Sequence, residues 1–156
     1  MPMLSQQEKS ERAKEIRWGE EQEDDLFRQW RRLSKYARHG SLVLRSKPGA
    51  AWDRMLLSKE GLPLCYVELK VRRSEWGMYG EDVIFPLTKH KFAIRLQKYN
   101  LAFIGVTRYS CGNIVEVHLG DEPHEFLDIS RRDRSTGPVP HVRYTEGALT
   151  VFPPTR

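Results

Sequence analysis

The sequence has no long apolar run and only two cysteines. No apolar run approaches the ~20 residues that a helix needs to cross a bilayer. The start "MPMLSQQEKSERAKEIR" also lacks the apolar centre of a secretory signal. Cys65 and Cys111 form neither a metal-ligand spacing nor a disulfide framework. We therefore expect a cytoplasmic protein without a membrane segment, in which both thiols are buried or incidental.

Other absences narrow the function further. The chain has no repeat, no low-complexity tract and no glycine-rich phosphate loop opening a helix, so a nucleotide-triphosphate motor is not expected. The five histidines show no metal-ligand spacing, and we expect only His90 near a site. What is present, 156 residues of which 39% are hydrophobic and 30% charged, is typical of one folded domain with a real core.

The charge is positive overall and unevenly distributed. The net charge is +5, and two stretches, 26–52 and 83–115, contain no acidic residue but many lysines and arginines. The first 25 residues instead carry eight acids against four bases. Carboxylates beside a basic field are suited to binding cations next to a phosphate backbone, although a solvated helix face of mixed charge explains them equally well.

The hydrophobic spacing predicts an α/β fold in which a mixed β-sheet is flanked by α-helices. Helices are expected at about 5–36, with a possible break at Gly19, and at 89–99, capped by Thr88; strands are expected at 41–46, 51–58, 63–71, 101–109 and 113–119. Residues 72–86 are expected to form a loop. We divide the chain into a core, 1–120, and a C-terminal extension, 121–156, that forms a hairpin across Glu146 and Gly147 and packs on the same domain.

The strand at 63–71 carries two charges at its centre. Glu68 and Lys70 point to one face, because side chains alternate along a strand, while Val67 and Leu69 point to the other. If the strand at 51–58 pairs with it around Gly61, opposed residues have numbers that add up to 121, and Asp53 faces Glu68 with Cβ atoms about 5 Å apart. Two like charges so placed are unfavourable unless a cation lies beside them.

The first helix supplies a third carboxylate. At about 100° per residue, Glu23 lies close to the centre of the apolar face, with Glu20 at its edge. A glutamate on a packed face is expected to be paired or coordinating. A salt bridge to an arginine or lysine at the core edge is the alternative for Glu23.

Three carboxylates and a lysine next to basic stretches suit the hydrolysis of a phosphodiester. Carboxylate oxygens from Asp53, Glu68 and Glu23 would hold Mg²⁺ or Mn²⁺, which polarises the phosphate and activates a bound water. Lys70 would orient or deprotonate that water, or neutralise developing charge on the phosphate.

These residues resemble the PD-(D/E)XK nuclease superfamily. Asp53, then fourteen residues, then Glu68-Leu69-Lys70 is similar to its D…ExK signature. The segment "GEEQEDDLFRQW" resembles the G-x-x-x-E helix of the Holliday-junction resolvase and VRR-type branches, and "LVLRSKPGAAWDRMLL" and "PLTKHKFAIRLQKYNLAFIGVTR" resemble the segments before and after the signature. The resemblance covers residues 16 to 108; it departs at Trp52, where proline is usual, and near His90 or Lys91, where the second helix often carries glutamine.

The resemblance implies a restriction-endonuclease-like fold and a metal-dependent endonuclease acting on DNA, on branched or structured substrates in recombination, repair or phage replication. Asp53, Glu68, Lys70 and Glu23 would be its catalytic residues. A homodimer would suit branched DNA best. We expect DNA contacts from basic residues around this site, namely Arg45, Lys47, Arg72, Arg73, Lys89, Lys91 and Arg95. In the loop after the signature, Trp76 and Tyr79 could stack on an unpaired base.

Two other functions stay open at this point. One is a non-catalytic DNA-binding or interaction module that retains the same fold. The other is an RNA-binding or RNA-cleaving protein, since a basic charge does not distinguish the two nucleic acids.

Overall fold

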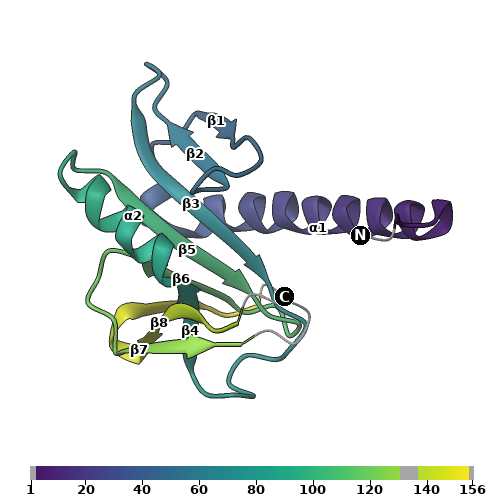
Figure 1. The fold of residues 1–156 in the computed structure, drawn as a ribbon. Coiled ribbons are helices and arrows are strands. Elements are labelled where there is room, and N and C mark those ends of the chain that lie inside the picture. The colour runs from purple at the N-terminus through teal and green to yellow at the C-terminus, as the bar shows by residue number, and fades with distance from the viewer. Residues whose placement is uncertain (1–2, 131–136, 155–156) are drawn as a thin grey trace.

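The computed structural model describes residues 3–130 and 137–154, which form a mixed α/β fold (Figure 1). The chain order is α1 (Gln6–Leu33), η1 (Lys35–Ala37), β1 (Leu42–Arg45), β2 (Arg54–Leu57), β3 (Pro63–Val71), β4 (Asp82–Pro86), α2 (Leu87–Gln97), β5 (Ala102–Arg108), β6 (Ile114–His118), β7 (Glu125–Ile129), β8 (Val139–Thr145), η2 (Glu146–Ala148) and β9 (Leu149–Phe152). The predicted fold class, a mixed sheet flanked by helices, is confirmed.

A six-stranded sheet in the order β1-β2-β3-β5-β6-β9 forms the centre of the molecule. Strands β3 and β5 are parallel, and the other neighbouring strands are antiparallel. β5 was predicted as an apolar strand buried on both faces, and its five central residues are buried as expected. The parallel pairing requires a crossover between β3 and β5, and β4 and α2 provide it.

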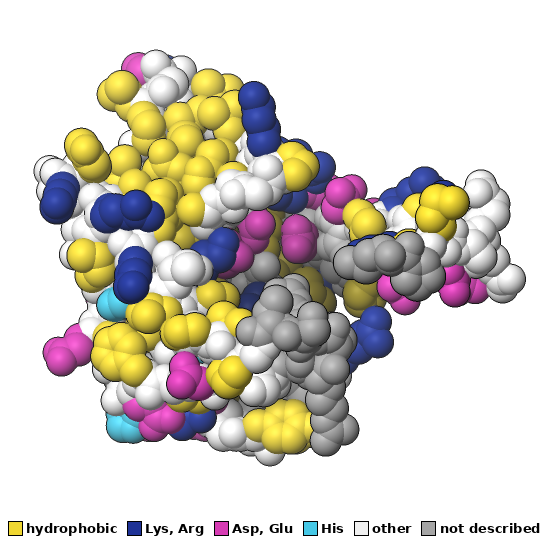
Figure 2. Space-filling view, viewed as in Figure 1, with side chains coloured by type: hydrophobic (Ala, Val, Ile, Leu, Met, Phe, Trp, Pro, Cys, Tyr) yellow, Lys and Arg dark blue, Asp and Glu magenta, His cyan; other side chains and the backbone are white. Residues whose placement is uncertain are grey.

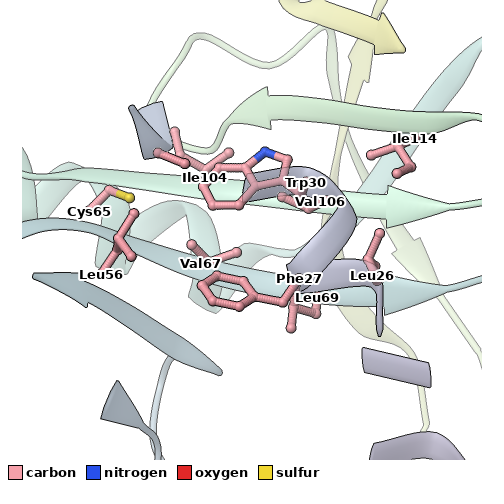
Figure 3. Packing of buried hydrophobic residues seen from close by; sticks show 11 residues of the cluster. Leu26, Phe27, Trp30, Leu56, Cys65, Val67, Leu69, Ile104, Val106 and Ile114 are labelled. Carbon is pink, nitrogen blue, oxygen red and sulfur yellow. The ribbon is translucent and has the colours of Figure 1, made fainter. Parts of the chain in front are cut away.

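Helix α1 covers one face of this sheet with its C-terminal half. Ser5 accepts a hydrogen bond from the backbone of Glu8, whose side chain accepts from Ser5 in return, so a capping box starts the helix. Leu26, Phe27 and Trp30 are buried against strands β2, β3, β5 and β6 (Figure 3). The N-terminal half extends away from the sheet (Figure 1), and the helix continues through Gly19, so the predicted break there is wrong.

The opposite face of the sheet is covered by α2 and by a small antiparallel sheet in the order β4-β8-β7. Phe85 of β4, Ala93 of α2 and Tyr144 of β8 are fully buried there with Phe103 of β5. Thr88 does not cap α2, because the helix begins at Leu87 and Pro86 occupies the cap position. The molecule therefore has three layers, with the large sheet between α1 and the layer of α2 and the small sheet.

Two sequence predictions about strands are wrong. Residues 82–86, expected to lie in a loop, form β4. The C-terminal hairpin does not form, because β8 pairs with β4 and β7 while β9 pairs with β6 in the other sheet. Glu146 and Gly147 lie in a 3-10 helix that carries the chain from one sheet to the other. The segment 121–156, of which 131–136 and 155–156 lie outside the described residues, thus completes both sheets.

Within residues 3–130 and 137–154, neither α1 nor α2 is long and apolar enough to span a membrane.

Candidate functional site

The pairing of β2 with β3 brings Asp53 beside Glu68. The register of the hairpin matches Arg54 with Val67, Met55 with Tyr66 and Leu56 with Cys65, as the predicted sum of 121 requires. The regular register ends at Arg54: Asp53 lies just before β2, and its backbone N–H donates at 3.0 Å to the carbonyl of Val67, the residue paired with Arg54. The Oδ2 atom of Asp53 accepts a hydrogen bond from the backbone N–H of Leu69 at 2.8 Å. The side chain of Asp53 is thus fixed against the centre of β3.

Glu68 lies on the sheet face that also carries α2. Its side chain is 15% exposed, and Lys89 of α2 places Nζ 3.1 Å from Oε2. Oε2 is buried, and the Lys89 ammonium is its ion-pair partner. Burial, reinforced by the negative charge of Asp53, raises the pKa of Glu68 to about 7, although Lys89 acts in the opposite direction.

Glu23 approaches Asp53 from α1. It is half-buried, whereas Glu20, one turn earlier, is exposed. Burial raises the pKa of Glu23, and the charge of Asp53 raises it further, while Arg54 opposes both. Of the two candidate glutamates on α1, Glu23 is therefore the one that faces Asp53.

Lys70 is held on the same face as Glu68, two residues further along β3. Its Nζ donates to the carbonyl of Ile84 at 2.6 Å and lies 4.6 Å from the ring centroid of Phe85. Both partners belong to β4, the strand that sequence reasoning missed. The Lys70 ammonium is close enough to oppose the rise in the pKa of Glu68.

Asp53 influences both Glu68 and Glu23, but the three carboxylates do not form a ready three-ligand site. Within residues 3–130 and 137–154, no group of three or more His, Cys, Asp or Glu side chains is arranged to hold a metal ion. Asp53 instead engages the backbone of Leu69, and Glu68 is paired with Lys89. Figure 2 shows acidic and basic side chains gathered beside α1 where it passes the sheet.

A second charged cluster next to this site was not foreseen. Asp24 of α1 forms ion pairs with Arg45 of β1 and, at 2.7 Å, with Arg54 of β2. Burial alone would raise the pKa of Asp24, but the hydrogen bonds from Arg54 and Arg45 outweigh it and hold the pKa below its ordinary value. Arg54 is 7% exposed. The sequence feature that could have revealed this buried charge is an arginine inside a predicted strand, directly after Asp53. This cluster fixes α1 to the edge of the sheet.

The residues predicted to bind nucleic acid fall into two groups. Arg45 and Lys89 are committed to partners within the protein, Asp24 for Arg45 and both Glu68 and the carbonyl of Ala51 for Lys89. The residues that are exposed and have no ion pair within residues 3–130 and 137–154 are Lys47, Arg72, Arg73, Lys91 and Arg95.

Three aromatic residues with expected roles lie outside the carboxylate cluster. Tyr79 is 84% exposed, whereas Trp76 is half-buried and packs edge-on against Tyr109, with ring centroids 5.1 Å apart. His90 points its Nδ1 atom at the carbonyl of Leu119 and the hydroxyl of Tyr144, at 2.8 Å and 3.0 Å. His90 therefore joins α2 to the small sheet.

Comparison of the chain with protein-family models, with curated proteins and with solved structures finds no match. The case for a function therefore rests on the residues and their geometry.

Proposed function

We propose that this protein is a metal-dependent nuclease that hydrolyses DNA phosphodiester bonds. One observation carries the proposal: Asp53, fixed by the Leu69 backbone, lies beside the buried Glu68 on a strand that also carries Lys70, and burial with the charge of Asp53 raises the pKa of Glu68. A strongly perturbed carboxylate with specific charged partners is characteristic of functional sites. The surrounding surface supports a polyanionic substrate, since Arg72, Arg73 and Lys47 are exposed.

The donor set fits a divalent cation. Glu68 Oε2 is buried with Lys89 as its ion-pair partner, and the charge of Asp53 acts unfavourably on both Glu68 and Glu23, which added positive charge would relieve. Asp53 and Glu68 would be the ligands of Mg²⁺ or Mn²⁺, with Glu23 as a third. When bound, such an ion would polarise the phosphate and lower the pKa of a water ligand.

The protein's own residues would supply the remaining functions. Lys70, anchored by the carbonyl of Ile84, is positioned to orient a water or stabilise negative charge on the phosphate. The hydrogen bond from the Leu69 backbone holds the Asp53 carboxylate in place. When a cation binds Glu68, the Lys89 ammonium would have to move away from the carboxylate or contact it together with the cation.

Cleavage assays test the proposal. Labelled linear, single-stranded and four-way-junction DNA would be incubated with the protein in Mg²⁺, Mn²⁺ or EDTA. We expect metal-dependent cleavage that Asp53→Ala and Glu68→Ala abolish, and that the control Glu60→Ala, an exposed carboxylate in the β2–β3 turn, retains. Full activity of the Glu68→Ala protein would refute the assigned site.

The second candidate is a DNA-binding module with this fold but without catalysis. The observation that favours it is the engagement of both lysines, Lys70 with Ile84 and Lys89 with Glu68. An ammonium paired with Glu68 occupies the position where a metal ion would bind. DNA binding without cleavage under every metal would support this alternative.

A further inference from the structure

We propose that the groove between α1 and the C-terminal end of β3 binds a single strand of DNA. This inference rests on the proposed function only in its choice of DNA as the polyanion. The groove has a volume of about 680 Å³ and is bounded by α1, the ends of β3 and β5, and the turn before β6. A pocket of this size holds a ligand larger than an ion.

The positive charge of the groove is not neutralised from within. Arg32, Arg72 and Arg73 line it, are exposed, and have no ion pair within residues 3–130 and 137–154. Asp25, the one carboxylate among its lining residues, is already paired with Arg108 at 2.9 Å. Three uncompensated guanidinium groups favour a ligand with several negative charges along its length, such as a phosphodiester backbone.

The fourth arginine, Arg108, is part of the wall rather than a free cation. Besides Asp25, it donates to the side-chain oxygens of Gln22 at 2.6 Å and Gln29 at 3.0 Å. These contacts join α1 to the end of β5 and fix one side of the groove. The site is therefore formed by ordered elements of the protein, and α1 also presents Glu23 to the carboxylate cluster.

An aromatic surface accompanies the charges. Trp18 lies on the part of α1 that extends beyond the sheet, is 47% exposed, and has the Arg73 guanidinium 5.6 Å from its ring centroid. Tyr109 lines the groove as well, and burial raises its pKa while the nearby Arg72 opposes the rise. Unpaired bases stack on aromatic rings and on guanidinium planes, whereas the bases of a duplex are already stacked on one another.

The groove and the candidate site are formed by neighbouring parts of the sequence. Arg72 and Arg73 directly follow Val71, the last residue of β3, and Glu68 and Lys70 lie in the same strand. From Glu68 to Arg72 the strand spans about 13 Å, roughly two nucleotides of an extended strand. Because the groove lies on the α1 face and Glu68 and Lys70 lie on the face of α2 and β4, a strand held by Trp18 and the arginines would reach them by passing around the end of β3.

Binding of a labelled 20-nucleotide oligothymidylate, measured by fluorescence anisotropy in EDTA, tests this inference without requiring metal or cleavage. We expect Trp18→Ala to weaken binding about tenfold and Trp18→Phe to weaken it less, because one stacked base is lost or retained. Arg73→Ala should weaken binding and reduce the slope of log K against log salt by about 0.7. Lys59→Ala is the control, since it removes one charge at the opposite end of β3, about 30 Å away.

The outcomes separate this inference from the nuclease proposal. Selective loss of binding in the Trp18 and Arg73 variants, with no DNA cleaved in any metal, would support the groove and refute the nuclease. Cleavage by wild-type protein with unchanged binding by Trp18→Ala would refute the groove alone. Equal binding of a duplex of the same length, tighter binding of the corresponding RNA strand, or an equal loss in Lys59→Ala would also overturn it. Circular dichroism of each variant confirms that α1 is retained.

Discussion

The buried carboxylate of Glu68 predicts an unusual pH dependence of stability. Replacing Glu68 with glutamine keeps the shape of the side chain but removes its charge and its titration. The pKa of Glu68 rises from an ordinary value of 4.5 to about 7 in the folded protein. Between pH 4.5 and 7, the folded state therefore binds more protons than the unfolded state, so wild-type stability falls as the pH rises.

The magnitude follows from the shift. At 1.36 kcal/mol per pKa unit, ionised Glu68 lowers the free energy of unfolding by about 3 kcal/mol above pH 7, and by less than 1 kcal/mol near pH 5. The side chain is only 15% exposed, so solvent screening removes little of this effect. Glu68→Gln also loses the ion pair with Lys89, which lowers the free energy of unfolding of the variant. This loss does not alter how the free energy of unfolding of wild type changes with pH. Relative to wild type, Glu68→Gln should therefore gain about 2 to 3 kcal/mol between pH 5 and pH 8.

Urea unfolding followed by tryptophan fluorescence, in EDTA at pH 5 and pH 8, measures this difference. Glu60→Gln is the matched control, because it makes the same substitution at an exposed glutamate in the β2–β3 turn, outside the buried cluster. Adding Mn²⁺ at pH 8 to about 100 times its dissociation constant should stabilise wild type by roughly 2.7 kcal/mol, and Glu68→Gln by less. A stability difference between Glu68→Gln and wild type that is equal at both pH values would refute the argument for Glu68.

Two further predictions concern the partners of buried carboxylates. Lys89→Met removes the ammonium that opposes the rise in the pKa of Glu68, so this pKa should move above about 7. A carboxyl ¹³C NMR titration would measure the change. An unchanged pKa would mean that the ion pair is absent in solution. Trp30 Nε1 and Ser34 Oγ both donate to Oε2 of Glu116, each at 2.7 Å. Glu116→Ala removes this acceptor and should lower the free energy of unfolding by about 2 to 5 kcal/mol in urea titrations. Glu116→Gln keeps an acceptor and should lower it less.

The sequence was sufficient to predict the local geometry of the β2–β3 hairpin. The alternation of apolar side chains along 63–71 decides which face of the strand packs against α1, and a slip by one residue would have turned Val67 and Leu69 to the opposite face of the sheet. Gly61, with φ of +82°, adopts the left-handed conformation that the turn requires. Asp53 and Glu68 could therefore be placed together from sequence alone. Glu23 could be placed similarly, because the helical period fixes its direction relative to Phe27 and Trp30.

What could not be predicted depends on contacts between distant segments. Strand β4 is five residues long and follows a glycine-containing loop, and its partner β8 begins more than fifty residues later. Nothing local indicates that pairing, so Lys70 could not be assigned its partner Ile84. The turn at Gly147 has the composition of a hairpin turn between β8 and β9. β9 instead pairs with β6, at the edge of the large sheet. The pairing of Lys89 with Glu68 likewise depends on how α2 lies across the sheet.

The contact between Lys89 and Glu68 also bears on whether the site needs a metal ion. An ammonium 3.1 Å from a carboxylate ordinarily lowers its pKa, yet the pKa of Glu68 remains raised to about 7. One positive charge is therefore insufficient to offset burial together with the repulsion from Asp53. A divalent ion carries twice the charge of one ammonium. An ion bound at Glu68, as in the proposed nuclease, would therefore offset more of this unfavourable charge than Lys89 alone does.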